Sequence, residues 1–146
     1  MLHRRVDGDF SFVETLRHLI FATDCWLLRA VRREPHPYHP LGIGGPWLEE
    51  PERLGLDPAA DPGASEVLEV RRGRLAAVRE TFAGLSSDEL ERVTVPPDTP
   101  GHPPAVPHTV ERCLHTILNE EWWHRRYAER DLDALLSRPS GGPGST

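Results

Sequence analysis

The 146-residue sequence predicts an all-α protein, and three observations indicate that class. Apolar residues recur every three or four positions in three long segments, which is the spacing of a buried helix face. Prolines crowd the intervening stretches 34–63 and 96–107, so no long helix or strand can run through either. No β-hairpin pattern occurs in the sequence. We therefore expect a helical bundle with long proline-rich loops.

The first helix is predicted from Ser11 to about Arg32. Ser11 and Glu14 have the spacing of a capping box, in which the serine accepts a first-turn amide and the glutamate reaches back. The apolar stripe that follows is wide, which indicates a helix packed on more than one side. Its members are Phe12, Leu16, Leu19, Ile20, Ala22, Thr23, Trp26, Leu27 and Val31.

Segment 34–63 should be a long loop, because seven prolines interrupt it. We expect Trp47 and Leu48 to hold this loop against the bundle and residues 49–54 to form a single helical turn. Loops of this length in a compact domain often cover a site. The loop is therefore predicted to form a lid over one end of the bundle.

Two more long helices are predicted, from Ser65 to Ala83 and from Thr109 to Leu136, with a short helix at 86–89 between them. The first of them has Val67, Leu68, Leu75, Val78 and Phe82 on its apolar side and Arg71, Arg72, Arg79 and Glu80 opposite. The stripe of the second is Val110, Leu114, Ile117, Ala128, Leu132 and Leu135. Residues 1–138 are expected to form one domain and 139–146 a flexible Gly/Pro/Ser tail.

Composition excludes several functions. All 17 basic residues are arginine, so Schiff-base catalysis, pyridoxal phosphate attachment and a phosphate-loop lysine are ruled out. A net charge of -6 disfavours a nucleic-acid surface. No apolar run is long enough to span a membrane, and no signal-peptide pattern occurs, so we expect a cytoplasmic protein. Cys25 and Cys113 lie in predicted helices and are interpreted as buried thiols, although each is seven residues from a candidate ligand described next.

Glu120 and His124 stand one turn apart on the last helix, among apolar neighbours. A carboxylate and an imidazole in such a place need a shared proton, a hydrogen-bond network or a metal ion. His18 on the first helix offers a third ligand. Helical phase does not decide between Glu120 and Glu121, which lie about 40° and about 60° from His124 on opposite sides. A Glu-x-x-x-His pair by itself is more often a solvated surface contact.

The segments Phe10–Leu19 and Asn119–Leu132 resemble the two ligand-bearing helices of the DinB-like superfamily. The resemblance implies a four-helix bundle with a metal ion held by His18, Glu120 and His124. The order Glu then His is similar to that of the mycothiol-dependent maleylpyruvate isomerases, in which a substrate thiol completes the zinc sphere. The family normally has a full helix before the first ligand helix, whereas only residues 1–9 precede it here. The helix that would precede it is thus shortened or missing, which predicts an open flank near Trp26 and Phe82. We expect a second subunit, giving a homodimer, or the long proline-rich loop to cover this flank.

Other polar residues are weaker candidates. His115 is predicted on the surface, and Asp131 either orients a ligand imidazole or pairs with an arginine. Four more histidines lie in the proline-rich loops, where we expect exposure to solvent or contact with a substrate: His36, His39, His102 and His108.

The preferred interpretation is a divalent-metal-binding protein, with a thiol-dependent transferase or isomerase activity on a small molecule. The ion would lower the pKa of a small thiol, so that the thiolate attacks an electrophile. Zinc is the first choice, and nickel, iron and manganese accept the same ligands. The alternatives are a non-catalytic stress-associated or interaction module and a metal-dependent hydrolase.

Overall fold

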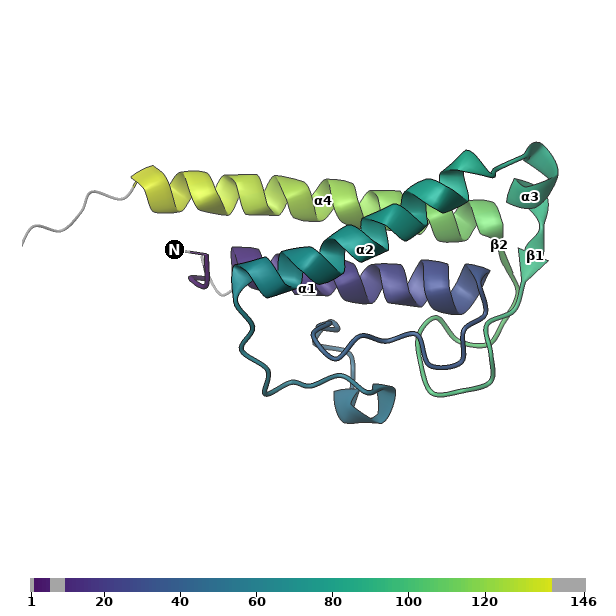
Figure 1. Ribbon diagram of the computed structural model, residues 1–146, viewed down its shortest axis with the longest axis horizontal. Helices are drawn as coiled ribbons and strands as arrows, with labels where there is room; N and C mark the ends of the chain where they lie inside the picture. Colours follow the sequence, from purple (N-terminus) through teal and green to yellow (C-terminus); the bar gives the residue numbers. More distant parts are fainter. Residues whose placement is uncertain (1, 6–9, 138–146) are drawn as a thin grey trace, which may run out of the picture.

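The computed structural model describes residues 2–5 and 10–137. Its helices are α1 (Phe12–Thr23), α2 (Ala64–Ala83), α3 (Ser87–Glu91) and α4 (Val110–Ser137). A π-helix, η1 (Asp24–Val31), continues α1, and η2 (Pro51–Leu54) is one 3-10 turn. In Figure 1, α4 runs antiparallel to α1–η1, and α2 crosses the pair obliquely. The all-α bundle predicted from the sequence is confirmed. The predicted tail at 139–146 lies outside the described residues.

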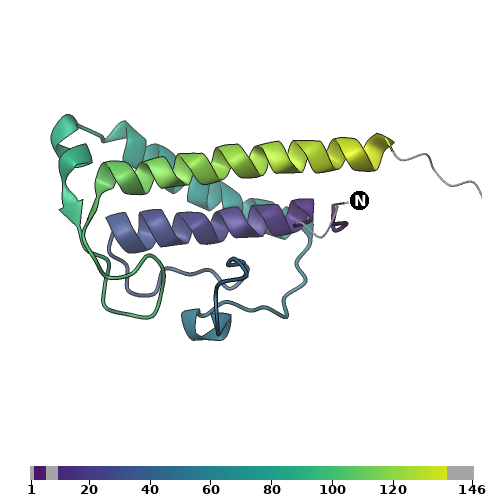
Figure 2. The ribbon, with the colours of Figure 1, turned by 180° about the vertical axis from the view of Figure 1, so that it is seen from behind.

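The helix formed by α1 and η1 is the centre of the fold. Its start is the predicted capping box, with Glu14 N donating to Ser11 Oγ at 3.2 Å and Ser11 N donating to Glu14 Oε2 at 2.8 Å. Packing on more than one side is confirmed, because α2 and α4 both contact this helix. The burial extends to polar residues, since Arg17, Asp24 and Arg29 are each at most 6% exposed. Figure 2 shows the helix enclosed between α4 and the loops.

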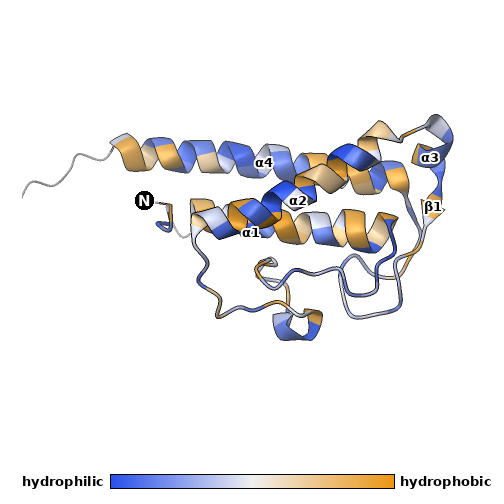
Figure 3. Cartoon of the chain, in the orientation of Figure 1, coloured by the Kyte–Doolittle hydropathy of each residue, from blue (hydrophilic) through white to orange (hydrophobic). Residues whose placement is uncertain are grey.

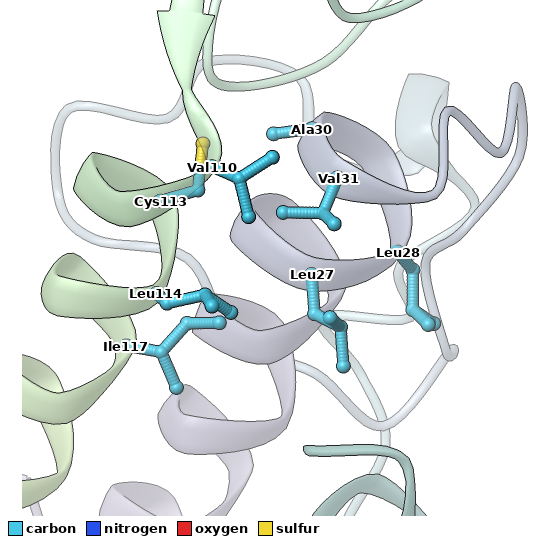
Figure 4. Packing of buried hydrophobic residues seen from close by; sticks show 8 residues of the cluster. All are labelled: Leu27, Leu28, Ala30, Val31, Val110, Cys113, Leu114 and Ile117. Carbon is cyan, nitrogen blue, oxygen red and sulfur yellow. The ribbon is translucent and has the colours of Figure 1, made fainter. Parts of the chain in front are cut away.

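The largest apolar cluster joins η1 to the first half of α4 (Figure 4). Leu27 from η1 and Val110 and Ile117 from α4 are each at most 1% exposed. Burial of a Leu, Ile or Val side chain contributes about 1.5–3 kcal/mol of transfer free energy, so this cluster fixes α4 against the central helix. The fixed pairing matters for function, because the candidate ligands are on α1 and α4.

Helix α2 differs from its predicted pattern. Leu68 and Phe82, placed on its apolar side, are 36% and 37% exposed, whereas Arg71, placed on its polar side, is only 6% exposed. The prediction for Arg71 was therefore wrong. Its guanidinium is buried because it reaches Glu121 on α4, a partner that the periodicity of α2 cannot reveal. Figure 3 shows the mixed hydropathy of α2.

The loop 32–63 lies along the side of α1 that faces away from α4 (Figure 1). Leu48, Leu54 and Leu56 pack against Phe21 and Cys25, which confirms that apolar residues anchor this loop. Trp47 is 55% exposed, although its ring lies 6.2 Å from that of Phe21. The predicted turn at 49–54 is present as η2.

No β-hairpin pattern was found in the sequence, yet the described residues include a minimal antiparallel pair. Strand β1 (Val93–Thr94) pairs with β2 (His108–Thr109), and the register places Thr94 opposite His108. The pairing closes the second proline-rich loop at its base. Two residues per strand carry no detectable alternation, so pattern analysis cannot find such an element. No helix in the described ranges is both long and apolar enough to cross a lipid bilayer.

Candidate metal centre

Helices α1 and α4 bring His18, Glu120 and His124 together, as the sequence predicted. One ligand atom from each residue lies within 4.8 Å of the other two, so the group could hold a metal ion. Glu120 Oε2 is 3.3 Å from His18 Nε2 and 3.1 Å from His124 Nδ1. All three residues are half-buried. Two residues come from adjacent turns of one helix and the third from its packed neighbour, which makes the support rigid.

A backbone carbonyl fixes the orientation of the His18 ring. His18 Nδ1 lies 3.0 Å from the carbonyl oxygen of Ile43, which accepts only, so Nδ1 carries a proton and donates it. In a neutral ring Nε2 then has a lone pair, and this lone pair faces Glu120 Oε2. That oxygen is buried and has no hydrogen-bond partner. Two facing acceptors are unfavourable unless a cation lies between them, either a second proton on His18 or a metal ion.

His124 has a similar arrangement within its own helix. Its Nδ1 lies 2.9 Å from the backbone carbonyl oxygen of Glu120 and 3.1 Å from Glu120 Oε2, and the tautomer of the ring decides whether Nδ1 donates to these oxygens or can bind a metal ion. Burial lowers the pKa of His124, so the imidazole is neutral near pH 7. The neighbouring His18 ring lowers the pKa of the Glu120 carboxyl, and this outweighs the effect of burial. A neutral imidazole and an ionised carboxylate are the forms that bind metal.

The structure distinguishes the two neighbouring glutamates. Both carboxylate oxygens of Glu121 accept hydrogen bonds from Arg71 Nη2 on α2. Glu121 therefore links α2 to α4, while Glu120 points at the two imidazoles. Helical phase left this choice open, and the structure places Glu120 in the group that could hold a metal ion.

A cavity of about 400 Å³ adjoins His124. Its other lining residues are Phe10, Thr15, Tyr127, Arg130 and Asp131. Asp131 is buried and accepts from Arg130 Nε at 2.7 Å, the arginine pairing weighed for it from the sequence. The ring centroid of Tyr127 lies 6.1 Å from that of His124. The cavity thus gives a small molecule a place beside His124, one of the three candidate ligands.

The remaining candidates lie away from this group. Cys25 and Cys113 are buried free thiols, as interpreted, and burial raises the pKa of Cys113 to about 11. His115 and His36 are exposed as expected. The expectation of exposure was wrong for His102, whose ring packs at 5.6 Å from Trp26 and 4.8 Å from Trp47.

The other two loop histidines are also partly enclosed. His39 and His108 are half-buried, and the His108 ring lies 5.7 Å from that of Trp26. The expectation of exposure to solvent overlooked the loops, which fold back onto the bundle and partly cover these rings.

Two residues that support the site had no sequence signal. Ile43 contributes only a carbonyl oxygen, which any residue type supplies. Arg71 was assigned to a solvent face. Such supporting residues are recognised only when the side chain that they contact is known. Ile43 orients the His18 ring, and Arg71 pairs with Glu121.

A sequence model described as the DinB superfamily matches residues 1–128. No curated protein and no solved structure shows significant similarity to the chain.

Proposed function

Because the chain belongs to the DinB superfamily, and because His18, Glu120 and His124 converge within it, we propose that it binds a divalent metal ion and acts as a thiol-dependent transferase or isomerase. The observation that carries the metal assignment is the facing of His18 Nε2 and Glu120 Oε2 at 3.3 Å, with Nδ1 of the same ring already donating to Ile43.

His18, Glu120 and His124 offer the kinds of ligand atom that the divalent metal ion implied by the family needs. Ligands about 2.0–2.2 Å from one ion at tetrahedral angles lie about 3.4 Å apart, close to the separation of the His18 and Glu120 atoms. The orphaned Glu120 oxygen would gain a partner. Two imidazoles and one carboxylate leave a coordination position for a further ligand, which is typical of catalytic sites. Zinc is our first choice for the ion.

The thiol chemistry rests on the order Glu then His on α4, which this chain shares with the mycothiol-dependent isomerases noted above. A bound divalent ion would lower the pKa of a small-molecule thiol, so that the thiolate forms near neutral pH. The protein's own residues would hold the ligands and shape the approach. Ile43 fixes the His18 ring, and the Glu120 carbonyl fixes that of His124.

The cavity beside His124 would receive the thiol or its electrophilic partner. Phe10 and Tyr127 supply aromatic surface to its wall, and Thr15 supplies a hydroxyl. Arg130 and Asp131 add a charged pair at the same wall. A small polar molecule with an apolar part suits this lining.

Metal analysis of protein purified without an affinity tag tests the first step. We expect one divalent ion per chain, loss of that ion in Glu120→Gln, and its retention in Glu121→Gln. The two variants make the same chemical change at adjacent positions, so they separate ligation from a general effect on α4. If both variants keep the metal, or if neither the wild type nor zinc-loaded protein holds it, the metal assignment fails.

X-ray absorption at the metal edge tests the second step. With a small thiol such as mycothiol present, a sulfur atom should enter the coordination sphere of the loaded wild-type protein. If sulfur stays out at saturating thiol while the metal remains bound, the thiol-dependent activity is excluded and the metal site stands.

A further inference from the structure

A second cavity of about 400 Å³ lies between the N-terminal half of α1 and the loop 32–63. Val13, Ile43, Leu48 and Leu56 give it apolar walls. Residues 42–45 form part of its wall. Within this segment, the Ile43 amide donates to the Arg17 carbonyl, and the Ile43 carbonyl accepts from His18 Nδ1. The backbone at Ile43 therefore contacts both sites: it orients His18 of the metal group and lines this cavity. None of the three candidate metal ligands lines the cavity.

Arg17 is the unusual residue of this cavity. It is 6% exposed, and no carboxylate in the described ranges forms an ion pair with it. Nε donates to the Leu41 carbonyl at 2.7 Å and Nη1 donates to the Ala60 carbonyl at 3.1 Å, so the side chain ties two parts of the loop together. Nη2 is buried and has no hydrogen-bond partner. Carbonyl oxygens satisfy donors but do not neutralise a charge, and in the described residues Glu14, Asp57 and Asp61 act on the buried guanidinium as nearby charges without a hydrogen bond to it.

The other charged groups of the cavity limit the choice of ligand. Arg5 is already paired with Glu14, through Nε at 2.8 Å. Glu14 and the exposed Asp61 also line the cavity, and their charges disfavour a ligand with several negative charges. One unpartnered guanidinium nitrogen and apolar walls match a molecule with a single carboxylate and an apolar body.

We propose that this cavity binds a small apolar monocarboxylate, with one carboxylate oxygen accepting a hydrogen bond from Arg17 Nη2. Because Nη2 is buried, the side chains over it must shift to admit the ligand oxygen. The site is separate from the metal group and does not depend on the function proposed above.

Benzoate is a suitable probe, and benzamide is its neutral control. In a heteronuclear NMR titration of the full chain, benzoate should cause saturable shifts at the amides of 42–45, whereas benzamide should bind at least tenfold more weakly. Arg17→Gln should weaken benzoate binding about tenfold or more, as expected for loss of one charge-assisted hydrogen bond. Arg5→Gln is the matched control, since it removes an exposed arginine from the same cavity, and should change the affinity by less than about threefold.

A second variant keeps the test decisive if Arg17→Gln does not fold, because Arg17 also ties the loop. Leu48→Trp enlarges a side chain of the cavity wall without touching Arg17, and should abolish benzoate binding. Glu120→Gln should leave benzoate binding unchanged, which separates this site from the metal group. Equal binding of benzoate and benzamide, wild-type affinity in a folded Arg17→Gln protein, or no saturable binding of benzoate would each overturn the proposal.

Discussion

Replacement of Arg29, the arginine of η1, should destabilise the protein more than replacement of the exposed Arg33 that follows η1. Arg29 is 1% exposed and donates four hydrogen bonds to the loop that follows β1. Nε reaches the Pro103 carbonyl at 3.1 Å, Nη1 reaches Thr99 Oγ1 at 2.9 Å, and Nη2 reaches the carbonyls of Pro97 and Thr99, both at 2.9 Å. The side chain is therefore the main polar link between the central helix and that loop.

The size of the effect follows from these acceptors. Arg29→Met keeps the stem and the helix propensity but leaves three carbonyls and one hydroxyl without their donor. Each buried group that loses its partner costs about 1–3 kcal/mol. The costs do not simply add, because three of the four bonds are only partly buried and the loop can rearrange toward water. We expect a loss of about 3–5 kcal/mol in the free energy of unfolding.

Urea denaturation followed by circular dichroism measures this loss, and thermal unfolding should show a fall of about 10–15 °C at about 3 °C per kcal/mol. Arg33→Met is the control, because Arg33 donates one bond at 3.0 Å to the Val95 carbonyl from an exposed position. The control should change stability by less than about 1 kcal/mol. If Arg29→Met loses no more than Arg33→Met, the buried bonds do not hold the loop and the reasoning is refuted.

Three further outcomes are expected. Metal affinity, measured by chelator competition between pH 5 and 8, should stay constant above neutrality and fall below about pH 6, because protons then compete with the metal for the imidazoles. Burial lowers the pKa of His124, so the fall in affinity moves to lower pH. An affinity that does not change with pH would exclude histidine ligation. Ile117→Ala, at a residue 1% exposed, should cost about 2–4 kcal/mol in urea denaturation, and a loss below about 1 kcal/mol would contradict the packing of α4 on η1. Light scattering should show a homodimer that Phe82→Ser weakens, since Phe82 is 37% exposed on the flank predicted to be open, and a wild-type monomer would count against it.

The sequence by itself determined the helical elements. The capping box at Ser11, the proline-rich stretches and the spacing of apolar residues on α4 are local features, and each acts within a few residues of chain. The pairing of Glu120 with His124 is of the same kind, because residues four apart on a helix share a face. For these reasons the approximate helix bounds could be predicted, whereas the choice of His18, Glu120 and His124 as candidate ligands came from the resemblance to the DinB-like superfamily.

The tertiary structure decided which side chains meet across elements. Arg71 is buried because it finds Glu121 on another helix, and that contact separates Glu121 from Glu120 as a ligand. His102 is packed because a loop returns to Trp47 and Trp26. Arg17, Arg29 and Arg71 are buried where partners on other elements accept some of their donors, and those partners lie tens of residues away in the chain. The periodicity of a single helix carries no information about that partner, so only the packed fold could place Arg71, Arg29 and Arg17.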